Sequence, residues 1–458
     1  MSLTDKPMAL AHRLGPFHVF LLAMSALSPA LSVFVFGGEI LKVAGTGAAL
    51  AFLCGAMVAV VWAMIYGELG DAFPHAGGEY AGINSTLGGA ACFAEITIKI
   101  VVYPASLAMS AVGFASYLRF LWSDFPVQST AALALAGAGL IGILNIRTNV
   151  LITGLFLGVE LMALCLVTFT GLAHPERSLT EAILHPVAIS GGSLAPVPLG
   201  VLALAAIAGA YATVGGNQAI NFGEEMDAPK GHMGWVVLSA CLVGAVFTAG
   251  PMLAAVLGAP DLAATLSADA PLSALLSRRT SPLVAGIVSV AVAGAVFNAL
   301  LATVLQQSRF LYSLSRDGLW TSSANAWLTR LHPRFRSPWT ATIALCALSV
   351  PLCFLEERTL LVLISSDVVF SLALVSLSVI AGRRRNITGG GFRSPLFPLF
   401  PMLGLLLSVL FAVSEYHDTA AGRPSLYLCG GLLLAGWLYF QAKLRNRPGG
   451  WAVKGARL

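Results

Sequence analysis

The chain has 458 residues, of which 57% are hydrophobic and only 10% are charged. Soluble domains carry roughly 25% charged residues, so this composition excludes a soluble globular protein and indicates an integral membrane protein. Because a spanning helix needs about 20 apolar residues, a chain of this length has room for many spans. A soluble enzyme held by a single membrane anchor is therefore also excluded.

Twelve apolar runs, separated by Gly, Pro and charged clusters, predict an all-α integral membrane fold with twelve transmembrane helices, which we number as spans 1 to 12. They lie near 17–41, 47–70, 88–118, 127–145, 150–172, 197–222, 234–258, 283–312, 338–355, 359–381, 395–414 and 425–442. The loops between them are too short for a separate soluble domain. We therefore expect residues 1–458 to form a single transmembrane unit.

The net charge of +5 follows the expected topology. Twelve spans place both termini on one side of the membrane, together with most of the 26 Lys and Arg, including the run Arg383–Arg385. Because Lys and Arg are enriched in cytoplasmic loops, we expect a multi-pass protein of the cell inner (cytoplasmic) membrane with both termini in the cytoplasm. Membrane lipid is the expected surrounding, and no nucleic-acid partner is expected.

Two spans carry helix-breaking residues near mid-length: Pro29 in span 1, and Gly215 with Gly216 in span 6. Proline removes a backbone donor, and a helix broken inside a membrane must border a cavity or a binding site. The alternative is a kink that only serves close packing. The candidate substrate-binding residues around the two breaks are Ser28, Ala30, Leu31, Ser32, Ala212, Thr213, Gly215, Gly216, Asn217 and Gln218.

The two breaks are five spans apart, as expected if residues of about 17–172 and 197–381 form inverted repeats, with extra helices at about 395–442. Such repeats are typical of secondary transporters. A broken helix offers free N–H groups to an anion and free carbonyls to a cation. A zwitterionic amino acid suits both, whereas a polyamine would use only carbonyls and carboxylates, so the pattern leaves both substrate classes open.

Three motifs resemble the amino acid–polyamine–organocation (APC) superfamily of transporters over nearly the whole chain. They are Tyr66-Gly-Glu-Leu-Gly-Asp-Ala-Phe-Pro-His-Ala-Gly-Gly-Glu-Tyr80, then Gly216 followed by Glu224-Glu225, and Asn298 to Gly318. The resemblance implies an amino acid permease with a five-plus-five inverted-repeat (LeuT-like) fold, discontinuous helices 1 and 6, and alternating access. The chain departs from the family at the span 1 break, where Pro29 to Ser32 replace the usual glycine-serine-glycine.

Ionisable residues inside spans are costly and are by default functional. Glu160 in span 5 lies near the position where some relatives carry a lysine, and is a candidate proton carrier, cation ligand or partner for a substrate amine; a structural ion pair is the alternative. In span 3, Glu95 and Lys99 are spaced for an ion pair on one helix face. Lys99 either completes that pair or neutralises Glu160. Glu160 and Lys99 are therefore the candidate coupling residues.

Charged residues near the span ends suggest gates. Glu224, Glu225, Arg309 and Arg316 are expected to meet on the cytoplasmic side, either as a gate or as weak ion pairs in a solvated loop. Asp367 in span 10 is expected nearer the outside, in an external gate or reaching toward the bilayer surface. The carboxylates of the first motif, which are Glu68, Asp71 and Glu79, are expected to be loop and gate residues.

No HExxH, GxSxG or GxxxxGK[ST] motif occurs in the chain, so zinc hydrolysis, serine acyl transfer and ATP-driven pumping lack their residues. We therefore expect a transporter rather than an enzyme, with no cofactor and no metal site. The leading hypothesis is proton-coupled uptake of amino acids. The alternatives are transport of polyamines or other organic amines, amino acid exchange, sodium coupling near Thr303, or a channel or sensor built on the same fold.

Overall fold

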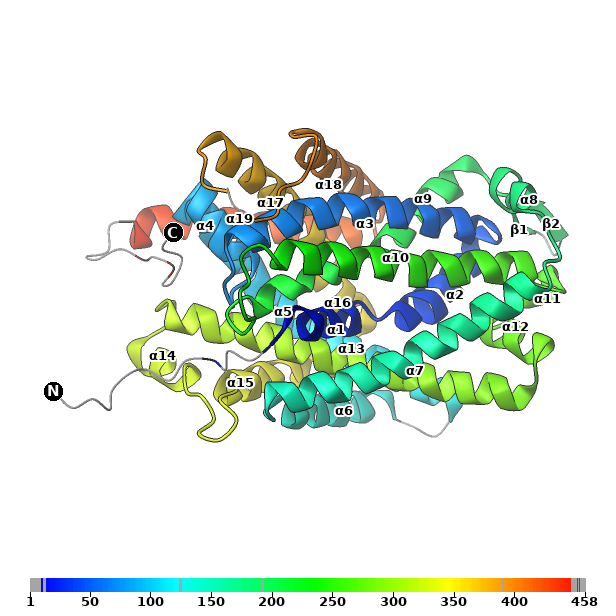
Figure 1. Cartoon of the computed structure of the whole chain (residues 1–458), viewed down its shortest axis with the longest axis horizontal. Coiled ribbons are helices and arrows are strands. Elements are labelled where there is room, and N and C mark those ends of the chain that lie inside the picture. The colour runs from blue at the N-terminus through cyan, green and yellow to red at the C-terminus, as the bar shows by residue number, and fades with distance from the viewer. Residues whose placement is uncertain are drawn as a thin grey trace.

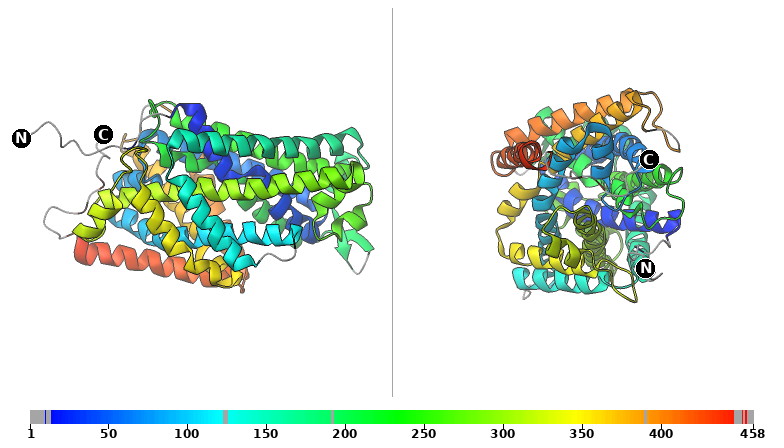
Figure 2. Two further views of the ribbon diagram at one scale, coloured as in Figure 1. Left: turned by 90° about the horizontal axis from the view of Figure 1, so that it is seen from below. Right: turned by 90° about the vertical axis from the view of Figure 1, so that its left-hand side faces the viewer.

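The structure, a computed structural model, describes residues 10, 14–122, 126–190, 193–388, 391–445, 451 and 453, and these are almost entirely helical. Long helices lie side by side in an elongated bundle (Figure 1). Both chain termini lie at the same end of this bundle, which we call the terminal end (Figures 1 and 2). The opposite end, which we call the far end, carries short helices and a small hairpin.

The first half of the bundle contains spans 1 to 5. Its elements are α1 (Pro16–Leu27), η1 (Leu31–Phe36), α2 (Gly37–Ala44), α3 (Gly47–Ala72), α4 (Glu79–Leu87), α5 (Gly89–Leu121), α6 (Val127–Gly142) and α7 (Ile146–Ala173). The connection at the far end then holds α8 (Leu179–Leu184), β1 (Val187–Ser190) and β2 (Ser193–Pro196).

The second half contains spans 6 to 10, followed by two further long helices. Its elements are α9 (Leu199–Thr213), η2 (Gly216–Phe222), α10 (Met233–Gly258), α11 (Leu262–Leu266), α12 (Pro271–Arg279), α13 (Pro282–Arg316), α14 (Ser322–Leu328), α15 (Trp339–Ser349), η3 (Pro351–Phe354), α16 (Glu357–Ile364), α17 (Asp367–Arg384), α18 (Leu399–His417), α19 (Gly422–Tyr439) and η4 (Phe440–Leu444).

Within the described residues, ten helical stretches are long and apolar enough to cross a membrane. Two shorter apolar helices, Val127–Gly142 and Trp339–Phe354, coincide with predicted spans 4 and 9. Every predicted span therefore corresponds to an apolar helix, and ten of them also have the full length. The protein is a multi-pass membrane protein.

Spans 1 and 6 are both interrupted where the sequence predicts. In span 1, α1 ends at Leu27, Ser28 has a φ of 46°, and the chain continues into the π-helical segment η1. In span 6, α9 ends at Thr213, and Gly215 has a φ of 151° before the 3-10 segment η2 begins. This φ lies in a region that L residues with side chains rarely adopt. The glycine is therefore what allows the chain to turn at this point.

A third interruption occurs in span 10, which the sequence pattern predicts as a continuous helix over 359–381. That prediction was wrong, because α16 ends at Ile364 and α17 begins at Asp367. The backbone N–H of Ser366 donates to Ser425 Oγ in α19 at 2.9 Å. The sequence Ser365-Ser366-Asp367 is typical of a helix start, but the apolar residues on both sides of it favour a continuous helix.

The connection over 172–196 is not a plain loop, so the expectation of a purely α fold needs correction. Strands β1 and β2 pair antiparallel, with Val187 opposite Pro196. The hairpin is tied to the turn between α2 and α3, because Thr46 N–H donates to Val187 O at 2.9 Å and Val187 N–H donates to Thr46 Oγ1 at 2.8 Å. The hairpin is therefore attached to the bundle at the turn that follows span 1.

Small residues set the closest helix contacts. Helix α3 packs along both α10 and α9, and α10 packs along α7. A Cβ on Gly55 of α3 would lie 2.4 Å from the carbonyl oxygen of Gly209 in α9. Membrane helices approach this closely only through small residues. Helices α3, α7, α9 and α10 therefore form a tight core. Between this core and helices α5, α13 and α17 there is space for a cavity.

Candidate functional site

The interior of the bundle holds a cavity of about 760 Å³, which we call the central cavity. Its lining comes from η1 and α2, α3, α4, α5, α9, η2, α13, α16, α17 and α18. It contains one lysine, Lys99, among carboxylates and amides, which are Glu39, Glu79, Asp367, Glu415, Asp418, Asn217, Gln218, Asn221, Gln306 and Gln307. The rest of the lining is largely apolar and aromatic, so the central cavity combines an apolar wall with acceptor-rich, predominantly anionic polar groups.

Three side-chain amide oxygens of the central cavity have no hydrogen-bond partner among the residues that the structure describes: Oε1 of Gln218, Oε1 of Gln306 and Oε1 of Gln307. Gln306 and Gln307 are 5% and 4% exposed. A buried acceptor without a donor is costly and calls for an explanation. A solute that brings N–H donors into this space would satisfy these oxygens.

Lys99 is held by carboxylates from three helices. Its Nζ lies 2.8 Å from Asp367 Oδ2, 2.9 Å from Glu79 Oε1 and 3.5 Å from Glu95 Oε1. The predicted pairing of Glu95 with Lys99 is thus present, but Glu160 is not among the carboxylates that Lys99 contacts. Lys99 therefore ties α5 to α4 and α17, and the expectation that it neutralises Glu160 does not match the observed contacts.

Two carboxylates lie closer to the site than the sequence predicts. Glu79 was expected in a loop or gate; it is the first residue of α4 and reaches Lys99 inside the bundle. Asp367 was expected at an external gate or at the bilayer surface. It lies in the first turn of α17, where a helix start favours a carboxylate, and it also pairs with Lys99.

Glu160 of α7 binds the span 1 break. Its Oε1 accepts hydrogen bonds from Ser28 Oγ at 2.9 Å and from the backbone N–H of Ala30 at 2.7 Å, and the residue is fully buried. Its Oε2 has no hydrogen-bond partner within the described part of the chain. A carboxylate at the start of a helix satisfies a free N–H and is favoured by the helix dipole. A free N–H group predicted at the span 1 break is therefore occupied by the protein's own carboxylate.

The predicted substrate-binding residues divide into two groups. Gly215, Asn217 and Gln218 line the central cavity. The others are not part of that lining; they are Ser28, Ala30, Leu31, Ser32, Ala212, Thr213 and Gly216. The two breaks nevertheless touch, because a Cβ on Gly215 would come within 3.0 Å of Leu27 Cα. The two breaks are therefore in direct van der Waals contact.

The four predicted gate residues meet in two ion pairs near the terminal end. Arg309 donates through Nε and Nη2 to both carboxylate oxygens of Glu225, with Nη2 to Oε1 at 3.0 Å, and each of these residues is 1% exposed. Arg316 donates to both oxygens of Glu224 at 2.6 and 2.7 Å. The alternative of weak pairs in a solvated loop is therefore wrong for Glu225 and Arg309, which are buried.

Glu224 is held in its ionised form by its surroundings. Burial acts to raise its pKa, but the hydrogen bonds from Arg316 and the attraction of His75 outweigh this effect, so the pKa of Glu224 lies below its ordinary value. The backbone N–H of Ala76 adds a further donor at 3.0 Å. These contacts join the segment after span 6 to α13 and to the loop before α4.

The segment after span 6 is also bound to the start of span 1. Leu14 N–H donates to Glu225 O at 3.0 Å, and Asp227 N–H donates to Leu14 O at 2.8 Å. Backbone and ion-pair contacts therefore connect both discontinuous spans and α13 at the terminal end. The bundle is closed there by polar contacts, on the opposite side of the breaks from the far end.

The other acids of the first motif anchor loops. Glu68 accepts from Arg383 Nε and Nη2, each at 2.6 Å, and from Ser394 Oγ at 2.7 Å. Asp71 accepts from the backbone N–H groups of Gly231 and Phe392, each at 2.9 Å. Among the described residues, no group of three or more His, Cys, Asp and Glu is arranged to hold a metal ion.

A membrane-spanning helical bundle with two touching helix breaks, a polar cavity and an ion-paired closure at one end defines a membrane transporter rather than an enzyme. The chain belongs to the amino acid permease family, whose family model matches residues 14–429. It is similar to the methylthioribose transporter of Bacillus subtilis (strain 168), at 24% identity over 90% of the chain and 90% of that protein.

Two further relatives are named for amino acids. The branched-chain amino acid permease BcaP of Bacillus subtilis (strain 168) is 23% identical over 95% of the chain and 94% of its own length. Asc-type amino acid transporter 1 of Homo sapiens is 27% identical over 64% of the chain and 56% of its own length. The similarity to BcaP thus extends over nearly the whole of both proteins.

Proposed function

We propose that this protein is a secondary active transporter that moves amino acids across the cytoplasmic membrane by alternating access, with proton coupling through Glu160. The observation that carries the proposal is the contact between the Glu160 carboxylate and the Ala30 N–H at the span 1 break, together with a cavity at the span 6 break that Asn217 and Gln218 line. Membership of the amino acid permease family supports the substrate class.

The amino group of the substrate would bind where acceptors are free. Oε1 of Gln218 and the carboxylates of Glu79 and Asp367 lie in the same cavity and offer hydrogen bonds and negative charge to an ammonium. The substrate carboxylate would replace Glu160 at the Ala30 N–H of the span 1 break, which favours anions because a helix starts there and which lies outside the cavity lining while Glu160 holds it. Each end of a zwitterion then meets its complementary break.

Proton coupling follows from competition for the same N–H. Ionised Glu160 holds the amide of Ala30, and its second oxygen, Oε2, has no donor, so burial of the negative charge is only partly compensated. Protonation removes that charge and weakens the hold on the amide, which a substrate carboxylate then takes over. Proton binding and substrate binding therefore favour each other, and this linkage is reciprocal.

The gating and topology complete the proposal. Glu225 with Arg309, and Glu224 with Arg316, form the cytoplasmic gate that must separate before the substrate is released. Twelve spans, inverted repeats over about 17–172 and 197–381, and cytoplasmic termini remain our proposed topology. The excess of Lys and Arg on the side of the termini supports this orientation.

A second candidate function is transport of polyamines or other organic amines. The observation in its favour is the charge of the central cavity, which contains five carboxylates, Glu39, Glu79, Asp367, Glu415 and Asp418, and a single lysine. An amine without a carboxylate group needs no site that binds an anion. Glu160 would then stay bound at the span 1 break during the whole transport cycle. Exchange of two substrates and sodium coupling are the corresponding alternatives for the mechanism.

The test is uptake into proteoliposomes of labelled neutral amino acids, basic amino acids and polyamines, with and without an inward proton gradient and with sodium replaced by choline. Gradient-driven accumulation of an amino acid without sodium is the expected result. Uptake of amines alone would establish the second candidate. Uptake only into preloaded liposomes would establish an exchanger, and loss of uptake in choline would establish sodium coupling.

A further inference from the structure

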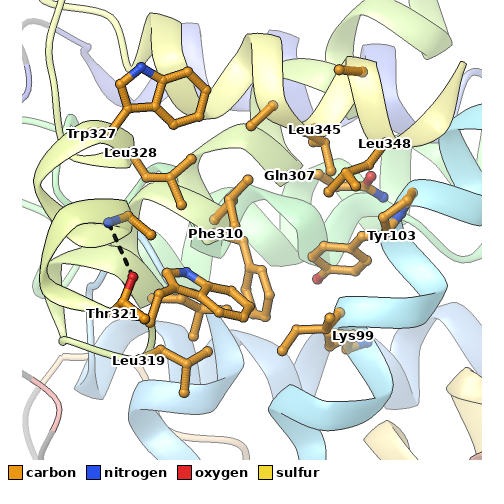
Figure 3. Close-up of a pocket in the computed structure, with 18 of the residues that line it drawn as sticks. Lys99, Tyr103, Gln307, Phe310, Leu319, Thr321, Trp327, Leu328, Leu345 and Leu348 are labelled. Carbon is orange, nitrogen blue, oxygen red and sulfur yellow. Dashed lines mark hydrogen bonds between the residues drawn. The ribbon is translucent and has the colours of Figure 1, made fainter.

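A second cavity, of about 1060 Å³, lies on the side of the bundle and does not depend on the proposed function. We call it the lateral groove. It lies over α5, with walls formed by α13, α14 and α15 and by α19 with η4. Figure 3 shows its side chains converging on the space, with Trp327 and Leu328 on one side and Tyr103 and Lys99 on the other.

The lining of the lateral groove is mostly apolar. Besides Pro104, its aliphatic and aromatic members include Phe310, Leu319, Trp320, Leu345 and Leu348. None of its described lining residues is a carboxylate, whereas Lys99 and Lys443 are both present. Its volume of about 1060 Å³ lies at the upper end of the range for small-molecule sites, which is about 300–1,000 Å³. The groove is therefore suited to an elongated apolar ligand with a negative end.

The two lysines are not equivalent. Lys99 is 5% exposed and already contacts three carboxylates. Lys443 lies in η4 at the end of α19, is exposed, and makes no ion pair within the part of the chain that the structure describes. Trp327 and Tyr439, also in the lining, are 41% and 52% exposed. Exposed Trp and Tyr gather at the level of lipid headgroups, so Lys443 is available to a headgroup.

From this arrangement we propose that the lateral groove binds an anionic phospholipid. Its phosphate pairs with Lys443, and its acyl chains lie along the apolar lining formed by α13 and α15. Basic side chains between membrane helices are suited to anionic headgroups. The absence of carboxylates from the described lining removes the repulsion that a phosphate would meet in the central cavity. A zwitterionic lipid has no net negative charge, so Lys443 should favour an anionic lipid over it.

The lateral groove also touches the central cavity. Lys99, Tyr103 and Gln307 line both. Gln307 Nε2 donates to Ser106 Oγ at 2.8 Å, which holds this wall to α5. Lipid in the groove therefore packs against the same side chains that border the central cavity, so the site is positioned to stabilise that wall.

The experiment is native mass spectrometry of the purified full chain, delipidated in detergent and titrated with phosphatidylglycerol or with phosphatidylcholine of the same acyl chains. We expect tighter binding of phosphatidylglycerol by the wild-type protein. Lys443→Gln should lower that affinity about fivefold, while Arg384→Gln, at an exposed arginine near the terminal end, should leave it unchanged.

A second variant blocks the groove itself. Ala344→Trp places a bulky ring in the lining and should abolish the tight lipid population, whereas Ile343→Trp, at the neighbouring position outside the lining and 42% exposed, should not. Thermal unfolding of all variants checks that they fold. Equal affinity for the two lipids, or tight binding that survives Ala344→Trp, would overturn the proposal.

Discussion

The two helix breaks occupy corresponding places in the chain but differ in chemistry. At the span 1 break, the backbone amide of Ala30 and the hydroxyl of Ser28 are both taken by the buried Glu160. At the span 6 break, Gln218 faces the central cavity and its Oε1 has no partner. One break is therefore closed by a titratable group of the protein, and the other is open to a solute.

This difference assigns two roles to the two breaks, response to protons and recognition of the substrate. If the breaks were treated only as corresponding parts of a repeat, they would have the same role. The carboxylate at span 1 can change its charge, so this break can respond to protons. The amides at the span 6 break cannot change charge, so this break can only recognise the substrate. Because Gly215 packs against Leu27, we expect a change at the first break to affect the second.

The largest expected effect is on stability, and it comes from breaking the buried ion pair between Arg309 and Glu225 that follows the span 6 break. Arg309→Met leaves Glu225 buried and unpaired, which should destabilise the protein by about 3–5 kcal/mol. Thermal unfolding in detergent measures the loss. The double variant with Glu225→Leu should recover much of the stability, and Arg384→Met, at an exposed arginine, serves as the control. Unchanged unfolding of the single variant would show that this pair does not anchor span 6.

A smaller loss should follow when the contact between the two breaks is disturbed. Gly215→Ala forces a side chain into a strained backbone conformation, at a cost of about 1–3 kcal/mol, and presses on Leu27. We expect lower thermal stability together with slower transport. Gly200→Ala in α9 is the control, because a Cβ there meets no atom within 4 Å. Equal behaviour of the two variants would contradict a close contact of the breaks.

A substitution at the span 6 break should affect substrate recognition only. Gln218→Leu removes the free acceptor, and the loss of a hydrogen bond worth about 0.5–1.5 kcal/mol should raise KM roughly twofold to tenfold. The pH dependence of transport should stay as in the wild type. Gln128→Leu, at an exposed position on α6, controls for added hydrophobicity. A changed pH profile in Gln218→Leu would contradict the division of roles between the breaks.

The smallest effect is expected at the partly exposed gate pair. Because the pKa of Glu224 lies below its ordinary value, its contribution is present at neutral pH and is lost as the pH falls below the ordinary range of about 4. Glu224→Gln should therefore lower the free energy of unfolding by about 1 kcal/mol or less at pH 7. It should also make that free energy less dependent on pH in the acid range. Glu357→Gln, at an exposed carboxylate, should show neither change.

The sequence was sufficient to predict the positions of the apolar helices, the breaks in spans 1 and 6 and the meeting of the four predicted gate residues, but not the interruption of span 10 or the hairpin. Proline, glycine and charge act locally, so Pro29 and Gly215 mark the breaks directly. The partners of Lys99 and Glu160 could not be predicted in this way. Asp367 lies 268 residues from Lys99, and Ser28 lies 132 residues from Glu160. Such contacts depend on how the helices pack, which an apolar pattern does not specify.

The central claim is that Glu160 couples proton movement to transport, and the most direct test compares the wild-type protein with Glu160→Gln in proteoliposomes. The glutamine can still accept from Ala30 and Ser28 but cannot titrate. With an imposed inward proton gradient, the account predicts accumulation of the substrate above its outside concentration by the wild type. The variant should bind the substrate and equilibrate it without any response to the gradient. Gradient-driven accumulation by Glu160→Gln equal to that of the wild type would contradict the claim.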